Sequence, residues 1–401
     1  MIDRAHPQRH HRILILGGGT AGISVAARLA KQIGHGEIAV VEPSSRHWYQ
    51  PLWTLVGGGM ATFAETQRDE RDLIPTGVQW IQDGVEAIDP EANRVRTASG
   101  DEIGYDHLVV ALGIQLDWGK IPGLAGNIGK HGICSNYSRE HVGDTWRTIQ
   151  EFRGGKALFT HPSTPIKCGG APQKIMYLAD DAFRERLKPS DYEVHFWCAL
   201  PNSFAVKRYA DSLDRVMERR GCSPHYREEL VELRPEQRIA VFENLDTKAR
   251  VEQPYDMIHV TPMMSAPDVI AASGLGNAGG WADVDKHTMR HVRFDNVWSL
   301  GDCSSLPTSK TGAAIRKQAP ALAQNLVSVL NGGDPLARYD GYTSCPLVTG
   351  RGKLVLAEFD YDKNPQETFP FDQSKERWSM YQLKRHLLPK LYWQGMLKGR
   401  A

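Results

Sequence analysis

Near its start the chain carries a complete dinucleotide-binding fingerprint. Gly17, Gly19 and Gly22 stand in G-x-G-x-x-G spacing between an apolar, strand-like stretch at 12–16 and a helix-like stretch. A second apolar stretch, EIAVVE, ends in Glu42, 20 residues beyond Gly22. This pattern predicts that loop N–H groups and a helix N-terminus bind a pyrophosphate, while Glu42 accepts hydrogen bonds from ribose hydroxyls. The first part of the chain is therefore constrained to a Rossmann-type βαβ unit.

Two further stretches favour FAD over NAD as the dinucleotide. YDHLVVALG at 105–113 is typical of a strand that runs into a glycine. NVWSLGDCSSLPTSKTGAAI at 296–315 indicates a strand, then Gly301 and Asp302, a polar loop and a helix. A returning Gly-Asp pair of this kind can hold the ribityl chain and pyrophosphate, and the helix after Lys310 would direct its N-terminal dipole at the flavin. On a simpler interpretation, Asp302 only caps that helix.

The order of these stretches predicts an α/β fold with two Rossmann-like domains. We expect an FAD-binding domain made of 10–145 and 295–345, interrupted by a second Rossmann-like domain at 146–294 and followed by a C-terminal region at 346–401. This arrangement is typical of two-dinucleotide-binding-domain flavoproteins, the relatives of disulfide reductases and type 2 NADH dehydrogenases. A chain of 401 residues is long enough for two or three domains. It has no run of about 18 apolar residues that would predict a membrane span.

The corresponding junction of the second domain carries a cysteine in place of a phosphate loop. The chain reads TPIKCGGAPQK at 164–174, between a strand-like and a helix-like stretch. A nicotinamide-binding flavoprotein would have a second glycine-rich phosphate loop here. Cys168 would instead lie beside a helix N-terminus and close to Lys167 and Lys174, all of which lower a thiol pKa. The sequence predicts a reactive thiol, with a chance cysteine in a turn as the alternative.

The other cysteines give weaker signals. Cys345 follows a turn and precedes a proline, so we expect a rigid loop there, and its role stays open from position alone. Cys198 is expected in a buried strand, Cys222 in an exposed turn, and Cys303 packed beside Asp302. Six cysteines in a chain of this length do not make a disulfide scaffold. No histidine or cysteine spacing indicates a metal site.

Several stretches, taken together, resemble one enzyme family. They are EPSSRHWYQPLWTLVGGG, TPIKCGGAPQKIMYL, VTPMMSAPDV, GDCSSLPTSKTGAA, YDGYTSCPLVTG and AEFDYDKNPQETFPFDQSKERWSMY. From about Arg12 to the C-terminus, the chain is similar to sulfide:quinone oxidoreductases of the mitochondrial-type (type II) branch. The resemblance implies FAD as cofactor, hydrogen sulfide as reductant and a ubiquinone-type quinone as electron acceptor. It places the redox-active cysteine pair of that family at Cys168 and Cys345.

The resemblance also implies a mechanism. Hydrosulfide attacks a disulfide or sulfur-bridged form of the pair, leaving a persulfide on Cys345 and a thiolate on Cys168. Two electrons pass through FAD to quinone, and an acceptor such as sulfite or glutathione takes the persulfide sulfur. Cys134 departs from the type II pattern and is either a third participating thiol or a buried one. For FAD, the resemblance carries over Thr20, Ala21, Gln50, Val85, Asp302 and Gly312, and we add Lys310, whose charge would offset negative charge on the flavin.

The end of the chain is basic and amphipathic. From residue 375 to 401, seven Lys and Arg side chains against Glu376 give a net charge of +6, and Trp and Leu are interleaved with them. Basic helices with aromatic residues lie in membrane interfaces, where anionic lipid attracts them. We expect Pro389 to divide this segment into two short helices that dock on a membrane near the quinone entrance. Packing on the core or on another subunit is the alternative.

The remaining sequence signals bound the function. The net charge of +1 gives no indication of nucleic acid as a partner. An NADH-fed flavin quinone reductase, a soluble sulfide oxidase that passes electrons to a cytochrome, and a non-catalytic FAD-bearing sensor of sulfide or persulfide stay open as alternatives. The N-terminus has no apolar core of a secretory signal. We expect peripheral attachment to a bacterial cytoplasmic membrane, or to the mitochondrial inner membrane in a eukaryote, and leave the oligomeric state, including a homo-oligomer, open.

Overall fold

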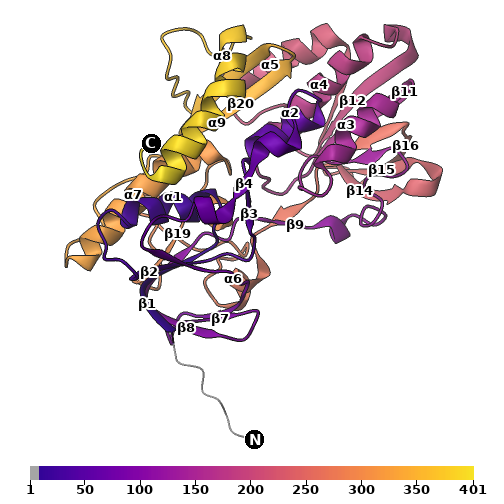
Figure 1. The fold of residues 1–401 in the computed structure, drawn as a ribbon. Helices are drawn as coiled ribbons and strands as arrows, with labels where there is room; N and C mark the ends of the chain where they lie inside the picture. Colours follow the sequence, from indigo (N-terminus) through magenta and orange to yellow (C-terminus); the bar gives the residue numbers. More distant parts are fainter. Residues whose placement is uncertain (1–8) are drawn as a thin grey trace, which may run out of the picture.

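A mostly parallel sheet forms around the first strand. In the computed structural model, which describes residues 9–401 (Figure 1), this seven-stranded sheet has the order β5-β2-β1-β8-β7-β6, and β19 also pairs with β8. The pairs β6–β7 and β7–β8 at one edge are antiparallel, and the other pairs are parallel. The strands are β1 (Arg9–Leu16), β2 (Ile38–Val41), β5 (Val78–Ile81), β6 (Val85–Asp89), β7 (Arg94–Thr97), β8 (Glu102–Val110) and β19 (Val297–Ser299).

Both faces of this sheet are covered, which explains why residues 13–16 of the central strand β1 are all apolar. Ile13 and Ile15 of β1 are buried together with α1 (Thr20–Leu29) and α7 (Gly312–Leu330). Leu14 and Leu16, on the opposite face, are buried together with residues of α6 (Asp268–Ala272). Parallel strands buried on both faces lack the alternation of apolar and polar residues.

A second sheet forms the other lobe of the molecule (Figure 1). It has five parallel strands in the order β10-β17-β11-β12-β13, packed with α3 (Val142–Glu151), α4 (Ala171–Arg184) and α5 (Lys207–Arg220). A three-stranded antiparallel sheet of β14 (Glu228–Arg234), β15 (Ile239–Asn244) and β16 (Arg250–Pro254) lies beside it. The predicted α/β fold with two Rossmann-like domains is confirmed. The five strands are β10 (Ile133–Cys134), β11 (Gly155–His161), β12 (Tyr192–Cys198), β13 (Cys222–Tyr226) and β17 (Met257–His259).

The chain passes from one lobe to the other at positions that differ from the expected domain boundaries, 145/146 and 294/295. Strand β10 pairs with β17 of the second sheet, so the chain has entered the second lobe by residue 133. Helix α6 contacts β6, so the chain has returned to the first lobe by residue 268. The two connecting segments pair with each other as β9 (Gln115–Leu116) and β18 (Met264–Ser265). Strands of two residues have no periodic pattern, which is why the sequence did not indicate them.

The C-terminal region begins with a β-hairpin and continues as a helical segment. Strands β20 (Thr343–Gly350) and β21 (Lys353–Phe359) are antiparallel, and β20 packs on α4. Next come α8 (Trp378–Gln382), a π-helical turn (Leu383–Leu387), α9 (Leu388–Lys390), a second π-helical turn (Leu391–Gly395) and a 3₁₀ turn (Met396–Lys398). The expected division at Pro389 is therefore wrong, because helical turns continue through it. The wide turns on both sides give the proline ring room within the helix.

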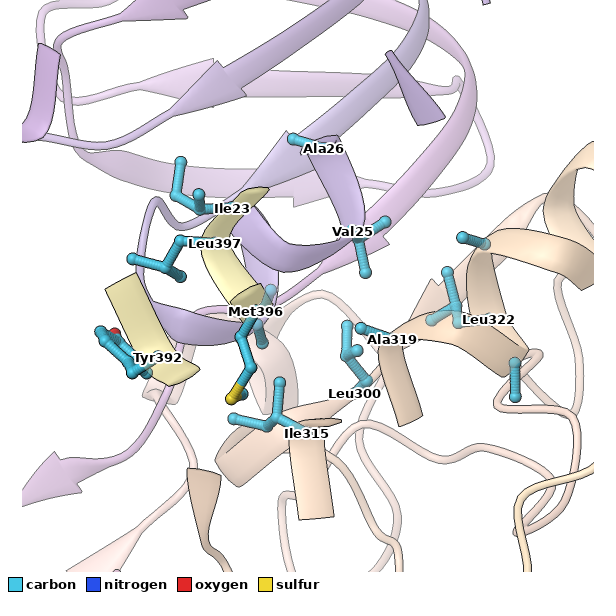
Figure 2. Close-up of a cluster of buried hydrophobic side chains, with 14 of the residues drawn as sticks. Ile23, Val25, Ala26, Leu300, Ile315, Ala319, Leu322, Tyr392, Met396 and Leu397 are labelled. Carbon is cyan, nitrogen blue, oxygen red and sulfur yellow. The ribbon is translucent and has the colours of Figure 1, made fainter. Parts of the chain in front are cut away.

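One face of this helical segment belongs to the core of the first lobe. Tyr392, Met396 and Leu397 are buried in the same cluster as Ile23 of α1 and Ile315 of α7 (Figure 2). On the opposite face, Trp378 and Leu387 are 68% and 58% exposed. Packing on the core therefore holds for one face of the segment, and membrane docking of the exposed face stays a prediction. Within residues 9–401, no helix combines the length and the apolarity needed to cross a bilayer.

Candidate active site

The glycine loop between β1 and α1 has the geometry of a nucleotide cradle. Gly17 has a φ of +101°, and a Cβ there would lie 2.4 Å from the carbonyl oxygen of Ala111. A Cβ at Gly22 would lie 1.8 Å from the carbonyl oxygen of Gly17, so only glycine allows α1 to pack this close to the loop. A Cβ at Gly19 would meet nothing within 4 Å. The loop therefore packs tightly against the protein at Gly17 and Gly22, and only Gly19 has free space beside it for a ligand.

Two acidic side chains lie at the carboxyl ends of strands near this loop. Glu42 accepts hydrogen bonds from the backbone N–H groups of Gly18 (2.8 Å) and Ser44 (2.8 Å), and burial raises its pKa. Asp302 follows β19; burial raises its pKa as well, and the nearby charges of Lys310 and Lys167 oppose that rise. Ligands of open α/β sheets bind at this end of the strands.

A cavity of about 360 Å³ extends from Thr20, directly after the glycine loop, to Cys168, whereas Cys345 is not among the residues that line it. It brings together six of the residues singled out in the sequence, although they come from four separate regions of the chain. Ala21 lies in the first turn of α1 and Val85 in β6, and neither is among the residues that line the cavity. Those that do line it are Thr20, Gln50, Cys168, Asp302, Lys310 and Gly312.

Cys168 and Cys345 lie next to each other at the N-terminus of α4. Their Sγ atoms are 3.6 Å apart, and both are free thiols. Cys168 has a φ of +56°, unusual for a side chain other than glycine, and its N–H donates to the carbonyl oxygen of Lys310 (2.9 Å). A Cβ at Gly170 would lie 2.8 Å from the Sγ of Cys345. The absence of a side chain at Gly170 is therefore what lets the second thiol approach the helix N-terminus.

Cys345 lies on strand β20 and not in the rigid loop expected from the sequence. Its side chain is 2% exposed. Pro346, which suggested a loop, pairs with Leu356 inside the two-stranded hairpin. A proline is tolerated in such a ribbon because one side of each strand needs no partner.

The charges around the pair make the two thiols different. Lys174 donates a hydrogen bond from its Nζ to the Sγ of Cys168 (3.0 Å). The hydrogen bond from Cys345 and the Lys174 ammonium together hold the pKa of Cys168 well below its usual range, despite burial. Burial would lower the pKa of Lys174, but the two sulfurs raise it. The hydrogen bond to Cys168 and burial raise the pKa of Cys345. The two pKa shifts therefore run in opposite directions, and Cys168 is the thiol that loses its proton more readily.

Three further lysines line the cavity. Lys167 donates to the Oε1 of Gln50 (2.9 Å) and lies over the ring of Trp53, and burial lowers its pKa to about 8. Lys384 is buried in the cavity wall, where burial and the charge of Lys174 lower its pKa to about 7. The sequence interpretation missed Lys384, because it counted this residue among the cations of a membrane-docking segment.

Lys310 faces backbone oxygens as well as the cavity. Its Nζ donates to the carbonyl oxygens of Asp302 (2.6 Å) and Ser304 (3.2 Å) and lies 3.8 Å from the ring centroid of Trp281. The Lys310 ammonium therefore stabilises the loop that carries Asp302 through these two hydrogen bonds, which the sequence did not predict.

The remaining cysteines lie away from the cavity. Cys134 is fully buried, does not line the cavity, and burial raises the pKa of its thiol to about 12. Cys198 and Cys303 are buried, as expected. The expectation for Cys222 is wrong: it is buried at the start of β13, because Gly221 ends α5 in a left-handed conformation and the strand begins at once. Among residues 9–401, no cluster of three or more His, Cys, Asp or Glu side chains could hold a metal ion.

Comparison with known proteins agrees with this geometry. Residues 11–155 match the family model described as pyridine nucleotide-disulphide oxidoreductase. The chain is 49% identical over 393 residues to the mitochondrial sulfide:quinone oxidoreductase of Mus musculus, an alignment that covers 98% of this chain and 87% of that protein. The chain belongs to the sulfide:quinone oxidoreductase family. It is also 46% identical to the Dictyostelium discoideum protein of the same name, over 97% of this chain and 86% of that one.

The fold is shared with a solved structure of the same kind. The sulfide:quinone oxidoreductase of Aquifex aeolicus matches with a TM-score of 0.82 and 20% identity, covering 98% of this chain and 92% of that one. Members of the family are flavoproteins that bind FAD. The glycine loop fits that cofactor: it is open at Gly19 only, and Thr20, Asp302 and Gly312 line the cavity that begins there.

Proposed function

We propose that this chain oxidises hydrogen sulfide at the Cys168–Cys345 pair and transfers the electrons through FAD to a membrane quinone. The observation that carries the proposal is the pair itself: two thiols 3.6 Å apart, one held as a thiolate by a buried lysine, in a cavity that reaches the glycine loop. The membership of the chain in the sulfide:quinone oxidoreductase family supports it.

The two cysteines divide the sulfur chemistry according to their charges. Hydrosulfide attacks the Sγ of Cys345 in the oxidised pair, the bond between the cysteines breaks, and the electron pair stays on Cys168 as a thiolate. Cys345 becomes a persulfide that holds the hydrosulfide sulfur and its proton. Lys174 favours this direction, because its ammonium lies 3.0 Å from the sulfur that receives the charge.

Release of the sulfur completes the cycle. An acceptor such as sulfite or glutathione takes the outer sulfur from Cys345 and leaves it reduced. Oxidation of the two cysteines then removes two electrons and re-forms the bond between them. FAD, when bound, accepts these two electrons and supplies them to the quinone. Lys174, Lys167 and Lys384 give the cavity the positive charge that an anionic acceptor needs.

We further propose that the exposed face of the C-terminal helical segment docks on a membrane and admits the quinone. Leu391 is partly exposed at the surface and also lines the cavity, and Leu388 lines the cavity next to it. Trp378 and Leu387 extend the exposed apolar face, and exposed Lys390 lies beside them. The relatives from mouse and Dictyostelium are named mitochondrial. The compartment, a bacterial cytoplasmic membrane or the mitochondrial inner membrane, stays a prediction.

The proposed reaction is tested by anaerobic addition of sulfide, with sulfite present as the sulfur acceptor, to the purified protein while the flavin spectrum is recorded, followed by a short-chain quinone. Sulfide should bleach the flavin absorbance, and quinone should restore it. NADH should leave the flavin oxidised, since the second junction has a thiol in place of a phosphate loop. Bleaching by NADH and not by sulfide would show that the proposal is wrong.

Membrane docking is tested separately with vesicles that contain anionic lipid. The double variant Leu387→Ser/Leu391→Ser should sediment with vesicles less than the unchanged protein. Val292→Ser is the matched control, because Val292 is 55% exposed elsewhere in the molecule. Equal sedimentation of all three proteins would exclude this face as the docking surface.

A further inference from the structure

The hydroxyl of Tyr137 is an unused donor beside the two thiols. The Tyr137 side chain is 3% exposed, lines the same cavity as Cys168, and packs in a cluster with Ile166, Ala171 and Met264 against which Cys168 lies. Within residues 9–401, its hydroxyl has no hydrogen-bond partner. A buried hydroxyl without a partner is unfavourable, so native structures rarely contain one without a reason.

Backbone hydrogen bonds to buried side chains fix the loop that carries Tyr137. The N–H of Asn136 donates to the Nε2 of His259 (3.1 Å), and the N–H of Tyr137 lies 3.4 Å from the Oγ of Ser135. His259 is fully buried, and burial lowers its pKa to about 3, so the ring stays neutral and can accept this bond. The tyrosine ring is therefore placed by its backbone and by packing, while the phenol group at its end stays without a partner.

The surroundings of the phenol keep it protonated. Burial and the negative charge of Cys168 both raise the pKa of Tyr137, and the hydroxyl of Thr261 opposes the rise. Thr261 is itself buried, and its hydroxyl has no partner of its own among residues 9–401. Thr261 can thus donate to the phenol oxygen, which leaves the phenol proton free to point at sulfur.

We propose that Tyr137 donates a hydrogen bond to the outer sulfur of the persulfide on Cys345. The inference rests on the proposed sulfide oxidation and names one further residue that contacts the reacting sulfur. The phenol keeps its proton, so no bond other than this hydrogen bond forms or breaks, and the balance of the reaction is unchanged. The contact stabilises the persulfide and orients its outer sulfur for attack, while the charge that builds as the acceptor attacks goes to the departing Sγ of Cys345.

The test is Tyr137→Phe in the FAD-loaded protein. The flavin should be reduced by sulfide about tenfold more slowly, which corresponds to one lost hydrogen bond in the transition state. The cyanide-releasable sulfur that stays on the protein after sulfide treatment should also decrease. The melting temperature should stay the same or rise, because the lost hydroxyl has no partner in this structure.

Tyr255→Phe is the matched control. Tyr255 is equally buried, and its hydroxyl also lacks a partner within residues 9–401, but it packs with Leu230 and Phe242 and does not line the thiol cavity. Its variant should keep the unchanged reduction rate and sulfur content. Thr261→Val should give a smaller decrease than Tyr137→Phe, in the same direction.

Each other outcome overturns the inference. If Tyr137→Phe matches Tyr255→Phe in rate and sulfur content, the hydroxyl has no role. A clearly lower melting temperature for Tyr137→Phe would show that the hydroxyl stabilises the fold and is not kept for sulfur. Failure of sulfide to bleach the unchanged protein would refute the proposed function itself, and the role of Tyr137 would be refuted with it.

Discussion

Two junctions of this molecule share the order strand, loop and helix N-terminus and use it for different chemistry. In the first, β1 leads through Gly17 and Gly22 into α1; in the second, β11 leads through Cys168 into α4. The N-terminus of a helix favours negative charge in either case. The first junction keeps Gly19 open to a ligand, and the second holds a thiolate in the corresponding place. The comparison teaches that the residues of the loop, and not the fold, decide which anion the helix stabilises.

The junctions also differ in the part of the C-terminal region that covers them. At the first, the hydroxyl of Tyr392 lies 2.8 Å from the Oγ1 of Thr20 and is also hydrogen-bonded to buried His47. At the second, strand β20 places Cys345 against Gly170. The C-terminal region thus contributes to both sites. The helical turn with Tyr392 forms a hydrogen bond to Thr20 at the nucleotide loop, and strand β20 supplies the second thiol.

The largest effect is expected from replacing either thiol of the second junction. Cys168→Ser and Cys345→Ser should each slow the bleaching of the flavin by sulfide on the order of 10³-fold or more, because residues that act as a unit lose nearly all activity together. The flavin content should not change, since the first junction is intact. Stopped-flow absorbance and the ratio of flavin to protein measure the two quantities.

Cys222→Ser is the control for that prediction, since Cys222 is buried in β13 far along the chain from both thiols. It should reduce at the unchanged rate. A Cys345→Ser variant that is still reduced rapidly would show that Cys168 works without this partner, and the pairing would have to be abandoned.

A smaller effect should come from adding one methyl group to each junction. Gly19 and Gly170 both have negative φ angles that alanine adopts, so neither substitution strains the backbone. Gly19→Ala should fold normally but lose FAD, because its Cβ occupies only open space over the loop. Gly170→Ala should keep FAD and react with sulfide about tenfold more slowly, because its Cβ would lie 2.2 Å from the Cδ2 of Leu347 and 2.8 Å from the Sγ of Cys345 and would displace strand β20.

The two alanine variants are compared by flavin content and by the rate of bleaching. Loss of flavin in Gly170→Ala with retention in Gly19→Ala would reverse the assignment of the two junctions.

Removal of the lysine at the second junction should shift the titration of its thiolate. In Lys174→Met, the hydrogen bond from Cys345 remains but the adjacent ammonium no longer offsets the burial of the Cys168 thiolate, so the pKa of Cys168 should rise. The thiolate fraction at a given pH then falls, and the pH at which alkylation of reduced Cys168 reaches half its maximum should move upward by about 1–2 units. Peptide mapping after iodoacetamide treatment over a pH series measures this shift.

Lys167→Met removes a cation of the same cavity that contacts Gln50 and Trp53 instead of a thiol. It should leave the alkylation profile of Cys168 nearly unchanged. Identical upward shifts in both variants would mean that the general charge of the cavity, and not the contact with Lys174, sets the thiolate.

The contrast between the junctions also explains what the sequence could predict. The glycine loop, Glu42 and Asp302 could be predicted as a cofactor site because fixed spacings within single segments define the local geometry, and their role stays a prediction. Cys168 was found for the same reason, since its helix follows directly in the chain. The environment of Cys345 was misjudged, because its strand is defined by pairing with β21 and by packing on α4. Lys384 and Tyr137 were missed, since they reach the thiols only through tertiary packing.

The smallest effect is expected at the contact that closes the first junction. Tyr392→Phe removes the hydrogen bonds of the Tyr392 hydroxyl to Thr20 and His47, and His47 then keeps only its bond to Glu70 (3.0 Å). Loss of these buried bonds should lower the free energy of unfolding by about 1–3 kcal/mol and weaken FAD binding, while alkylation of Cys168 stays unchanged. Tyr381→Phe is the matched control, because Tyr381 is buried in the same helical segment without a hydrogen bond from its hydroxyl to any of residues 9–401. Denaturant titration and flavin release on dilution measure the effect. If Tyr392→Phe released FAD no faster than Tyr381→Phe, the C-terminal segment would serve the second junction and the membrane face only, and the two sites would not share it.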